Sequence, residues 1–176
     1  MDYRVISIGT LAAHPLWEER GEVRTGHATT TLVTAGDMHL LVDPSLPPTA
    51  LLARLGERTP IRASDITHVF LTSADTLHRR GLAAFGSAEW LAGERELTET
   101  VAGFERQLAE SGDDAELSGA LRDELAILRR CRPAPDRLHD GVDLFPLPGV
   151  TPGCCGLLLS LPQSTVLIAG DAVATR

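Results

Sequence analysis

The sequence predicts an α/β sandwich, in which strands from both ends of the chain form sheets and helices pack outside them. Residues 4–8 alternate and carry β-branched side chains, which is typical of a strand. Residues 142–147 and 157–169 return to the same β character. Between them, residues 94–132 carry apolar side chains at intervals of three or four, which predicts a helical pair. Strands at both ends with helices between them favour a sandwich over a singly wound sheet.

The first half of the chain contains the signals of a hairpin, a helix and a buried strand. Residues 27–33 and 38–42 flank an Ala-Gly-Asp turn, which predicts an antiparallel hairpin. After a Pro-Pro pair, leucines at helical spacing predict a helix that ends at Gly56. The run THVFLT, residues 67–72, predicts a fully buried strand. A turn-rich patch and a short helix are expected over residues 73–85.

The second half is expected to be helical first and then to return to strands. A Ser-Gly-Asp-Asp break at residues 111–114 divides the helical pair, and its second helix stops before Pro133. A tight loop rich in proline and glycine covers residues 148–153. Residues 157–161 and 166–169 then predict a closing hairpin. Residues 89–92 fit either a strand or a helix.

Composition excludes several classes of function. The chain has 176 residues, which suits one domain over residues 1–176. A net charge of −8 argues against a nucleic-acid partner, because phosphate binding needs clustered cations. Three cysteines do not make a secreted disulfide framework, and no apolar run approaches the roughly 20 residues of a membrane span. No secretory signal is recognisable, so we expect a cytoplasmic protein with no membrane partner.

Four short motifs follow one another along the chain. They are LLVDPS (40–45), ITHVFLTSADTLHRRGLAAF (66–85), LPGVTPGCCGLLLS (147–160) and VLIAGDAV (166–173). In this order they resemble the LVDTG turn, the strand with its His-x-His-x-Asp-His motif, the PGHTPGH loop and the Gly-Asp strand of the metallo-β-lactamase superfamily. The resemblance implies an αββα sandwich. It also implies an incomplete domain with its C-terminal part missing, because the family's closing strands have no counterpart before Arg176.

In that family, imidazoles and carboxylates at strand ends hold one or two divalent ions, usually zinc. The metal lowers the pKa of bound water and polarises the substrate. Carried over to this sequence, the first two histidine positions hold Ser73 and Asp75, and the aspartate position holds Leu77. The last histidine is retained as His78. The motif is therefore degenerate.

The remaining family positions are partly retained. Val150 replaces the histidine of the PGH loop, and Asp171 keeps the carboxylate that usually bridges two metals. The resemblance leaves Asp75, His78 and Asp171 as residual metal candidates. It implies either no cofactor or one divalent ion, with zinc preferred, since the valine and the leucine cannot coordinate.

Each candidate also has an ordinary structural interpretation. His78 could pair with Asp75 or with Asp171, and Asp75 suits a turn. Asp171 could hydrogen-bond the loop after its strand. We place Ser73, His27 and Val150 at the cleft, although His27 also suits a purely structural role. No catalytic residue is assigned.

Two hypotheses of function remain open, and the sequence does not decide whether the protein is an enzyme. The first is a superfamily protein with an eroded metal site that lacks the standard hydrolase activity and serves in binding or assembly. The alternative is a single-metal hydrolase of a small ester, lactone or thioester. A sheet edge left uncovered invites strand pairing, so we expect a homo-oligomer. The small-molecule substrate is not specified by the sequence.

Overall fold

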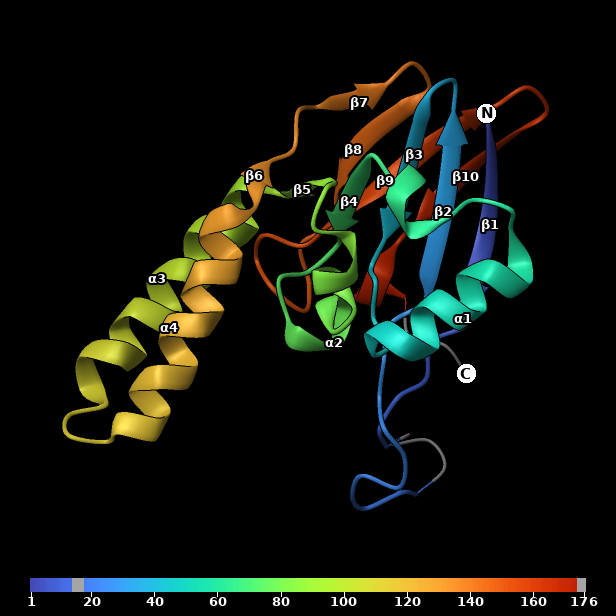
Figure 1. Ribbon diagram of the computed structural model, residues 1–176. Coiled ribbons are helices and arrows are strands. Elements are labelled where there is room, and N and C mark those ends of the chain that lie inside the picture. The colour runs from blue at the N-terminus through green and yellow to red at the C-terminus, as the bar shows by residue number, and fades with distance from the viewer. Residues whose placement is uncertain (14–17, 174–176) are drawn as a thin grey trace.

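The computed structural model describes residues 1–13 and 18–173 of the chain. Within these ranges two β-sheets pack face to face, and the α-helices lie outside the first sheet (Figure 1). The six-stranded first sheet has the order β1-β2-β3-β4-β5-β6, and the four-stranded second sheet has the order β10-β9-β8-β7. This arrangement confirms the predicted α/β sandwich.

The first sheet consists of β1 (Asp2–Ser7), β2 (Thr30–Ala35), β3 (Met38–Val42), β4 (His68–Leu71), β5 (Glu89–Ala92) and β6 (Arg132–Pro133). The second consists of β7 (Arg137–His139), β8 (Val142–Pro146), β9 (Cys155–Leu161) and β10 (Ser164–Ile168). The helices are α1 (Pro48–Arg58), α2 (Thr76–Arg79), α3 (Glu94–Glu110) and α4 (Ala115–Arg130), with short 3-10 turns η2 (Ala63–Asp65), η3 (Leu82–Phe85) and η4 (Gly170–Ala172).

Strands β2 and β3 form the antiparallel hairpin that the sequence predicts, with Ala35 opposite Met38. Gly36 in the turn has a φ of +55°, a conformation that glycine adopts without steric cost. Strands β3, β4 and β5 then run parallel, with Leu41 opposite Val69. Because parallel strands end at one edge of the sheet, the residues that follow β3 and β4 meet there.

Side chains of β4 alternate between two cores. Val69 and Leu71 pack with α1 and η3 on the outer side of the first sheet, whereas Phe70 points between the two sheets. Since both faces of β4 are buried, its three consecutive apolar residues are the pattern of a central parallel strand. The two cores bury β4 up to Leu71, and the residues of the candidate site follow this strand.

Two local assignments differ from the sequence prediction or go beyond it. The short helix expected at the end of residues 73–85 is the 3-10 turn η3, which follows α2 after two intervening residues and packs Phe85 in the core. The undecided segment Glu89–Ala92 is a strand, because its last three residues are buried and pair with β4 in parallel. In the described ranges no helix is both long enough and apolar enough to cross a membrane.

Helices α3 and α4 form an antiparallel hairpin that projects from the body (Figure 1). The carboxylate of Asp114 starts α4 by accepting a hydrogen bond from the N–H of Leu117 at 2.9 Å. At the base of the hairpin Leu97 and Leu128 join the outer core. This hairpin lies within the range 94–132 over which the sequence indicates a helical pair.

Candidate functional site

The candidate site begins with a turn after β3 that holds a buried carboxylate. Asp43 is 1 % exposed and has a φ of +48°, a left-handed conformation that aspartate tolerates better than most residues. Its carboxylate accepts hydrogen bonds from the N–H of Thr72 at 2.8 Å and from the Thr72 hydroxyl at 2.6 Å. These two bonds connect the ends of β3 and β4, so the carboxylate is held in one position.

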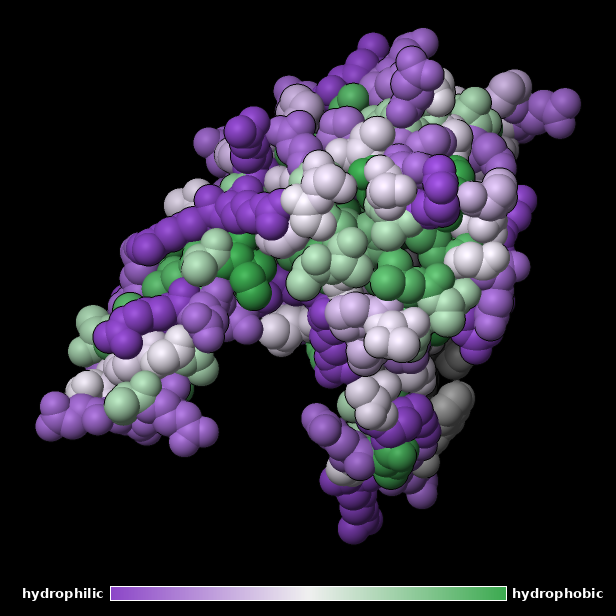
Figure 2. Space-filling view, viewed as in Figure 1, coloured by the Kyte–Doolittle hydropathy of each residue, from purple (hydrophilic) through white to green (hydrophobic). Residues whose placement is uncertain are grey.

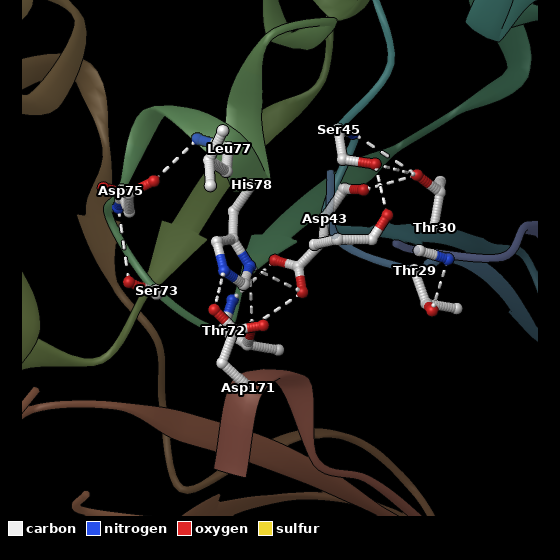
Figure 3. A network of polar contacts seen from close by, with 12 residues as sticks. Thr29, Thr30, Asp43, Ser45, Thr72, Ser73, Asp75, Leu77, His78 and Asp171 are labelled. Carbon is white, nitrogen blue, oxygen red and sulfur yellow. Dashed lines mark hydrogen bonds and ion pairs between the residues drawn. The ribbon is translucent and has the colours of Figure 1, made fainter. Parts of the chain in front are cut away.

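His78 lies on α2 between two carboxylates that come from different sheets (Figure 3). Its Nδ1 is 3.2 Å from Oδ2 of Asp43, and its Nε2 is 2.9 Å from Oδ2 of Asp171. The imidazole is 1 % exposed, whereas the Asp171 side chain is 46 % exposed. Both ring nitrogens therefore have carboxylate partners, and His78 links the first sheet to the end of the second.

The two carboxylates decide the protonation state of His78. Burial alone lowers the pKa of an imidazole, but the charge of Asp43 and the hydrogen bonds to Asp171 and Asp43 outweigh burial and raise the pKa of His78 to about 11. The same contact lowers the pKa of Asp171 below its usual value. At neutral pH His78 is therefore an imidazolium.

The turn η4 lies close to the end of β4, which brings Asp171 next to His78. Gly170, which follows β10 by two residues, has a φ of +52°. A Cβ atom at Gly170 would collide with the side chain of Thr72. Only glycine fits both the backbone conformation and the space, so the Gly-Asp pair is required as a unit.

Asp75 and Leu77 lie apart from the His78 cluster. The carboxylate of Asp75 accepts a hydrogen bond from the N–H of Leu77 at 2.8 Å and so caps α2. Figure 3 shows Asp75 on the far side of α2 from the imidazole, beside Leu77 and Ser73. The described side-chain contacts join His78 to Asp171, to Asp43 and to the Thr72 hydroxyl, whereas the Asp75 carboxylate caps α2.

Ser73 belongs to a second buried network, centred on the carboxylate of Glu96 at the start of α3. Glu96 is 2 % exposed and accepts hydrogen bonds from the Ser73 hydroxyl at 3.0 Å and from the N–H of Ala74 at 2.8 Å. The hydroxyl of Thr151 also donates to it. This carboxylate thus ties the loop after β4 to the loop before β9, and Ser73 does not line the cleft.

A cleft of about 500 Å³ opens between the edges of the two sheets. Of the three residues that the sequence places at the cleft, His27 and Val150 line it. Nε2 of His27 lies 3.1 Å from the carbonyl oxygen of Ile8, which gives this histidine a structural partner. Asp43 and Asp171 also line the cleft, so the His78 cluster lies at its polar end.

The residues at the candidate site do not fit the two-metal centre of the matched motifs. Nε2 of His78 is occupied by the carboxylate of Asp171, and Asp75 caps a helix. Val150 and Leu77 offer no ligand atom. Among the described residues no three His, Cys, Asp or Glu side chains converge in a way that could hold a metal ion.

Sequence reasoning missed the roles of Asp43 and Glu96. It includes Asp43 only within the LLVDPS motif, which resembles a turn of the family, and assigns nothing to Glu96. The Asp-Pro pair after a buried strand is a signal that could have identified Asp43 as part of the site, because strand ends carry the family's ligands. Glu96 lies among other charged residues of an amphipathic helix, and nothing in that pattern distinguishes a buried carboxylate from an exposed one.

Comparisons with known proteins agree with this fold. The family model described as the metallo-beta-lactamase superfamily matches residues 23–176. A putative metallo-beta-lactamase from Thermotoga maritima has a TM-score of 0.68 at 18% identity, covering 94% of this chain and 76% of that one. No curated protein sequence matches the chain.

Two further solved structures are described as lactone hydrolases. AidC, a dizinc quorum-quenching lactonase, has a TM-score of 0.61 at 19% identity, covering 80% of this chain and 54% of that one. An N-acyl homoserine lactone hydrolase has a TM-score of 0.56 at 14% identity, covering 82% and 66%. The chain thus spans between about half and three quarters of the length of these neighbours. At these identities the likeness is one of fold.

Proposed function

Because the chain belongs to the metallo-beta-lactamase superfamily, we propose that it is a member with an eroded metal site that lacks the standard hydrolase activity. Its function is to bind a small molecule in the cleft between the sheet edges. The fold is retained, and of the family's ligand positions His78 and Asp171 pair with each other, while His78 also pairs with Asp43.

One observation carries the first half of this proposal: both ring nitrogens of His78 contact carboxylates. A histidine binds a metal through a neutral ring nitrogen that carries no proton. Coordination by His78 would therefore require breaking its contact with Asp43 or with Asp171. Coordination through Nε2 would leave the buried contact of Nδ1 with Asp43 in place, but it would break the 2.9 Å ion pair with Asp171.

The cleft supports the second half of the proposal. Its volume of about 500 Å³ lies within the range of small-molecule sites. Its walls are mostly apolar and come from β1 and β10, including Val5, Val166 and Ile168. Asp171 provides one half-exposed carboxylate at the end of these walls. An apolar cleft with a few polar groups at one end suits a small, largely apolar ligand.

The competing function is a single-metal hydrolase of a small ester, lactone or thioester. The fold likeness to two proteins described as lactone hydrolases favours it. It requires Asp75 to leave its helix cap and to join His78 and Asp171 around one ion. The two functions are separated by whether the protein holds a metal.

The metal content per chain tests the first half of the proposal, that the metal site is eroded. The protein is purified without chelator or a metal-binding tag and analysed for zinc, iron and manganese, beside Asp171→Ala and the exposed control Asp37→Ala. We expect substoichiometric metal in all three and no rise in Tm when zinc is added. Near-stoichiometric metal that is lost in Asp171→Ala and kept in Asp37→Ala would overturn the proposal and establish the hydrolase as the better hypothesis.

The second half of the proposal, that the cleft binds a small molecule, is tested with Nile red, an uncharged apolar dye. Val150 lines the cleft and is 66 % exposed, so Val150→Asp should fold normally and weaken dye binding by introducing a charge. Val23 is 59 % exposed and lies outside the cleft, so Val23→Asp is the matched control. Equal dye affinity in both variants would refute the cleft as the binding site.

A further inference from the structure

The cleft between the sheet edges has an acidic end. Among its described lining residues, the acidic side chains are Asp43 and Asp171, and none of the lining residues is an arginine. The chain contains no lysine, and its net charge is −8. The charges around this cleft therefore favour a cationic ligand over an anionic one.

Asp171 is the acidic group that a ligand in the cleft can reach. Asp43 is almost fully buried, and both of its carboxylate oxygens accept hydrogen bonds from Thr72. Asp171 is half-exposed, and its Oδ2 lies 2.9 Å from Nε2 of His78 (Figure 3). Within the described part of the chain, no hydrogen bond or ion pair involves Oδ1 of Asp171. This carboxylate therefore has one oxygen available for a donor from a ligand.

His78 does not balance both acidic groups of the cluster. In the described contacts it is the one basic side chain that pairs with Asp43 and Asp171, so the cluster holds one acidic group in excess. The other imidazole of the cleft, His27, directs Nε2 to the carbonyl oxygen of Ile8 at 3.1 Å. An ammonium group at Oδ1 of Asp171 would supply the missing cation and form a charge-assisted hydrogen bond.

We propose that the ligand of the cleft is a small primary amine with an apolar body, whose ammonium group binds Asp171. This inference rests on the proposed binding function of the cleft. The wall residues Val5, Val166 and Ile168 lie on β1 and β10, and Asp171 follows the end of β10. An apolar body that packs along these strands therefore presents its head group to the carboxylate. Apolar walls with one charged group at their end determine both the orientation and the class of such a ligand.

The α3–α4 hairpin has a second hollow of similar volume, about 480 Å³, but its charges differ. Figure 2 shows apolar side chains along the middle of the hairpin, with hydrophilic ones at its margins. Glu105 borders this hollow and is paired with Arg129 at 2.7 Å, and Arg122 adds a second guanidinium group. Its described lining residues therefore leave no unpaired carboxylate for an ammonium group. Of the two hollows, the cleft is the one that selects a cation.

Displacement of Nile red from the cleft by three matched probes tests the preference for a cation. The probes are hexylamine, 1-hexanol and hexanoate, which carry similar apolar chains with a positive, a neutral and a negative head group at neutral pH. We expect hexylamine to displace the dye at a concentration at least about tenfold lower than 1-hexanol does, and hexanoate to be the weakest. The preference for hexylamine should shrink at high salt, because salt screens the charge of a half-exposed carboxylate.

Two variants show whether Asp171 selects the amine. Asp171→Asn keeps the shape of the side chain and removes its charge, so it should abolish the preference for hexylamine over 1-hexanol. Nile red is uncharged and should bind this variant as it binds the native chain, which shows that the cleft is intact. Asp37→Asn is the matched control, since Asp37 is exposed and lies outside the cleft, and it should keep the native preference.

Three results would overturn the inference, and they can be told apart. If 1-hexanol and hexanoate displace the dye as readily as hexylamine does, the cleft remains a binding site but has no preference for a cation. If the preference for hexylamine survives in Asp171→Asn, a group other than this carboxylate selects the amine. If Nile red shows no saturable binding to the native chain, the proposed function itself is wrong, and this inference is wrong with it.

Discussion

Raising the pH above neutral should destabilise this protein through one histidine. Contacts with Asp43 and Asp171 outweigh burial and raise the pKa of His78 from 6.5 to about 11 in the folded chain. Between these values the folded state binds a proton that the unfolded state has released. The stabilisation is therefore complete below pH 6.5 and is lost as the pH rises towards about 11. The expected loss in the free energy of unfolding is about 1.4 kcal/mol per pH unit.

Urea unfolding at a series of pH values measures this loss. The range from about pH 7 to about pH 8.5 is suitable, and over it the free energy of unfolding should fall by about 2 kcal/mol. Higher pH is less informative, because burial raises the pKa of Cys131 from 9.0 to about 11 and the thiol adds a pH dependence of the same sign. The slope between about pH 7 and about pH 8.5 therefore reports on His78.

Two variants show whether the slope belongs to His78. His78→Gln removes the titrating group and should give a nearly flat profile over the same range. His68→Gln alters a half-buried histidine at the other end of β4, whose ring nitrogen is 3.8 Å from Glu89, and should keep the native slope. A native profile that is already flat would refute the reasoning, since it would mean that His78 is neutral in the folded protein.

The other predictions concern the two buried networks and the lost ligands. Gly170→Ala should lower the stability by about 2 kcal/mol or more, because its φ is positive and its Cβ would collide with Thr72; thermal unfolding measures this. Glu96→Ala should lower the free energy of unfolding in urea by about 3 kcal/mol, because it leaves three hydrogen-bond donors without their acceptor. The control Glu99→Ala, which removes an exposed ion pair, should lower it by less than about 1 kcal/mol. Restoring the family's ligands should raise the affinity for zinc, as measured by calorimetric titration. The four substitutions, made together, are Ser73→His, Asp75→His, Leu77→Asp and Val150→His. If zinc affinity does not rise, the alignment of the motifs is wrong.

The sequence predicted most of the fold because the elements are encoded locally. The turn around Gly36 determines the β2–β3 hairpin, and the apolar run of β4 identifies a central strand. The order of the motifs then indicated the family, which the match over residues 23–176 confirmed. The 3-10 turn at η3 and the strand at Glu89–Ala92 were not distinguished, because short segments obtain their conformation from the neighbours they pack against.

The sequence alone determined that Leu77 and Val150 cannot bind a metal, since that depends only on which atoms a side chain carries. Tertiary structure decided which partner His78 has. The sequence left Asp75 and Asp171 as alternatives, and the fold pairs the imidazole with Asp171 and adds Asp43, which comes from a third segment of the chain. Spacing along a chain does not specify such a contact, because it arises only when parallel strands end at one edge and the second sheet closes over them.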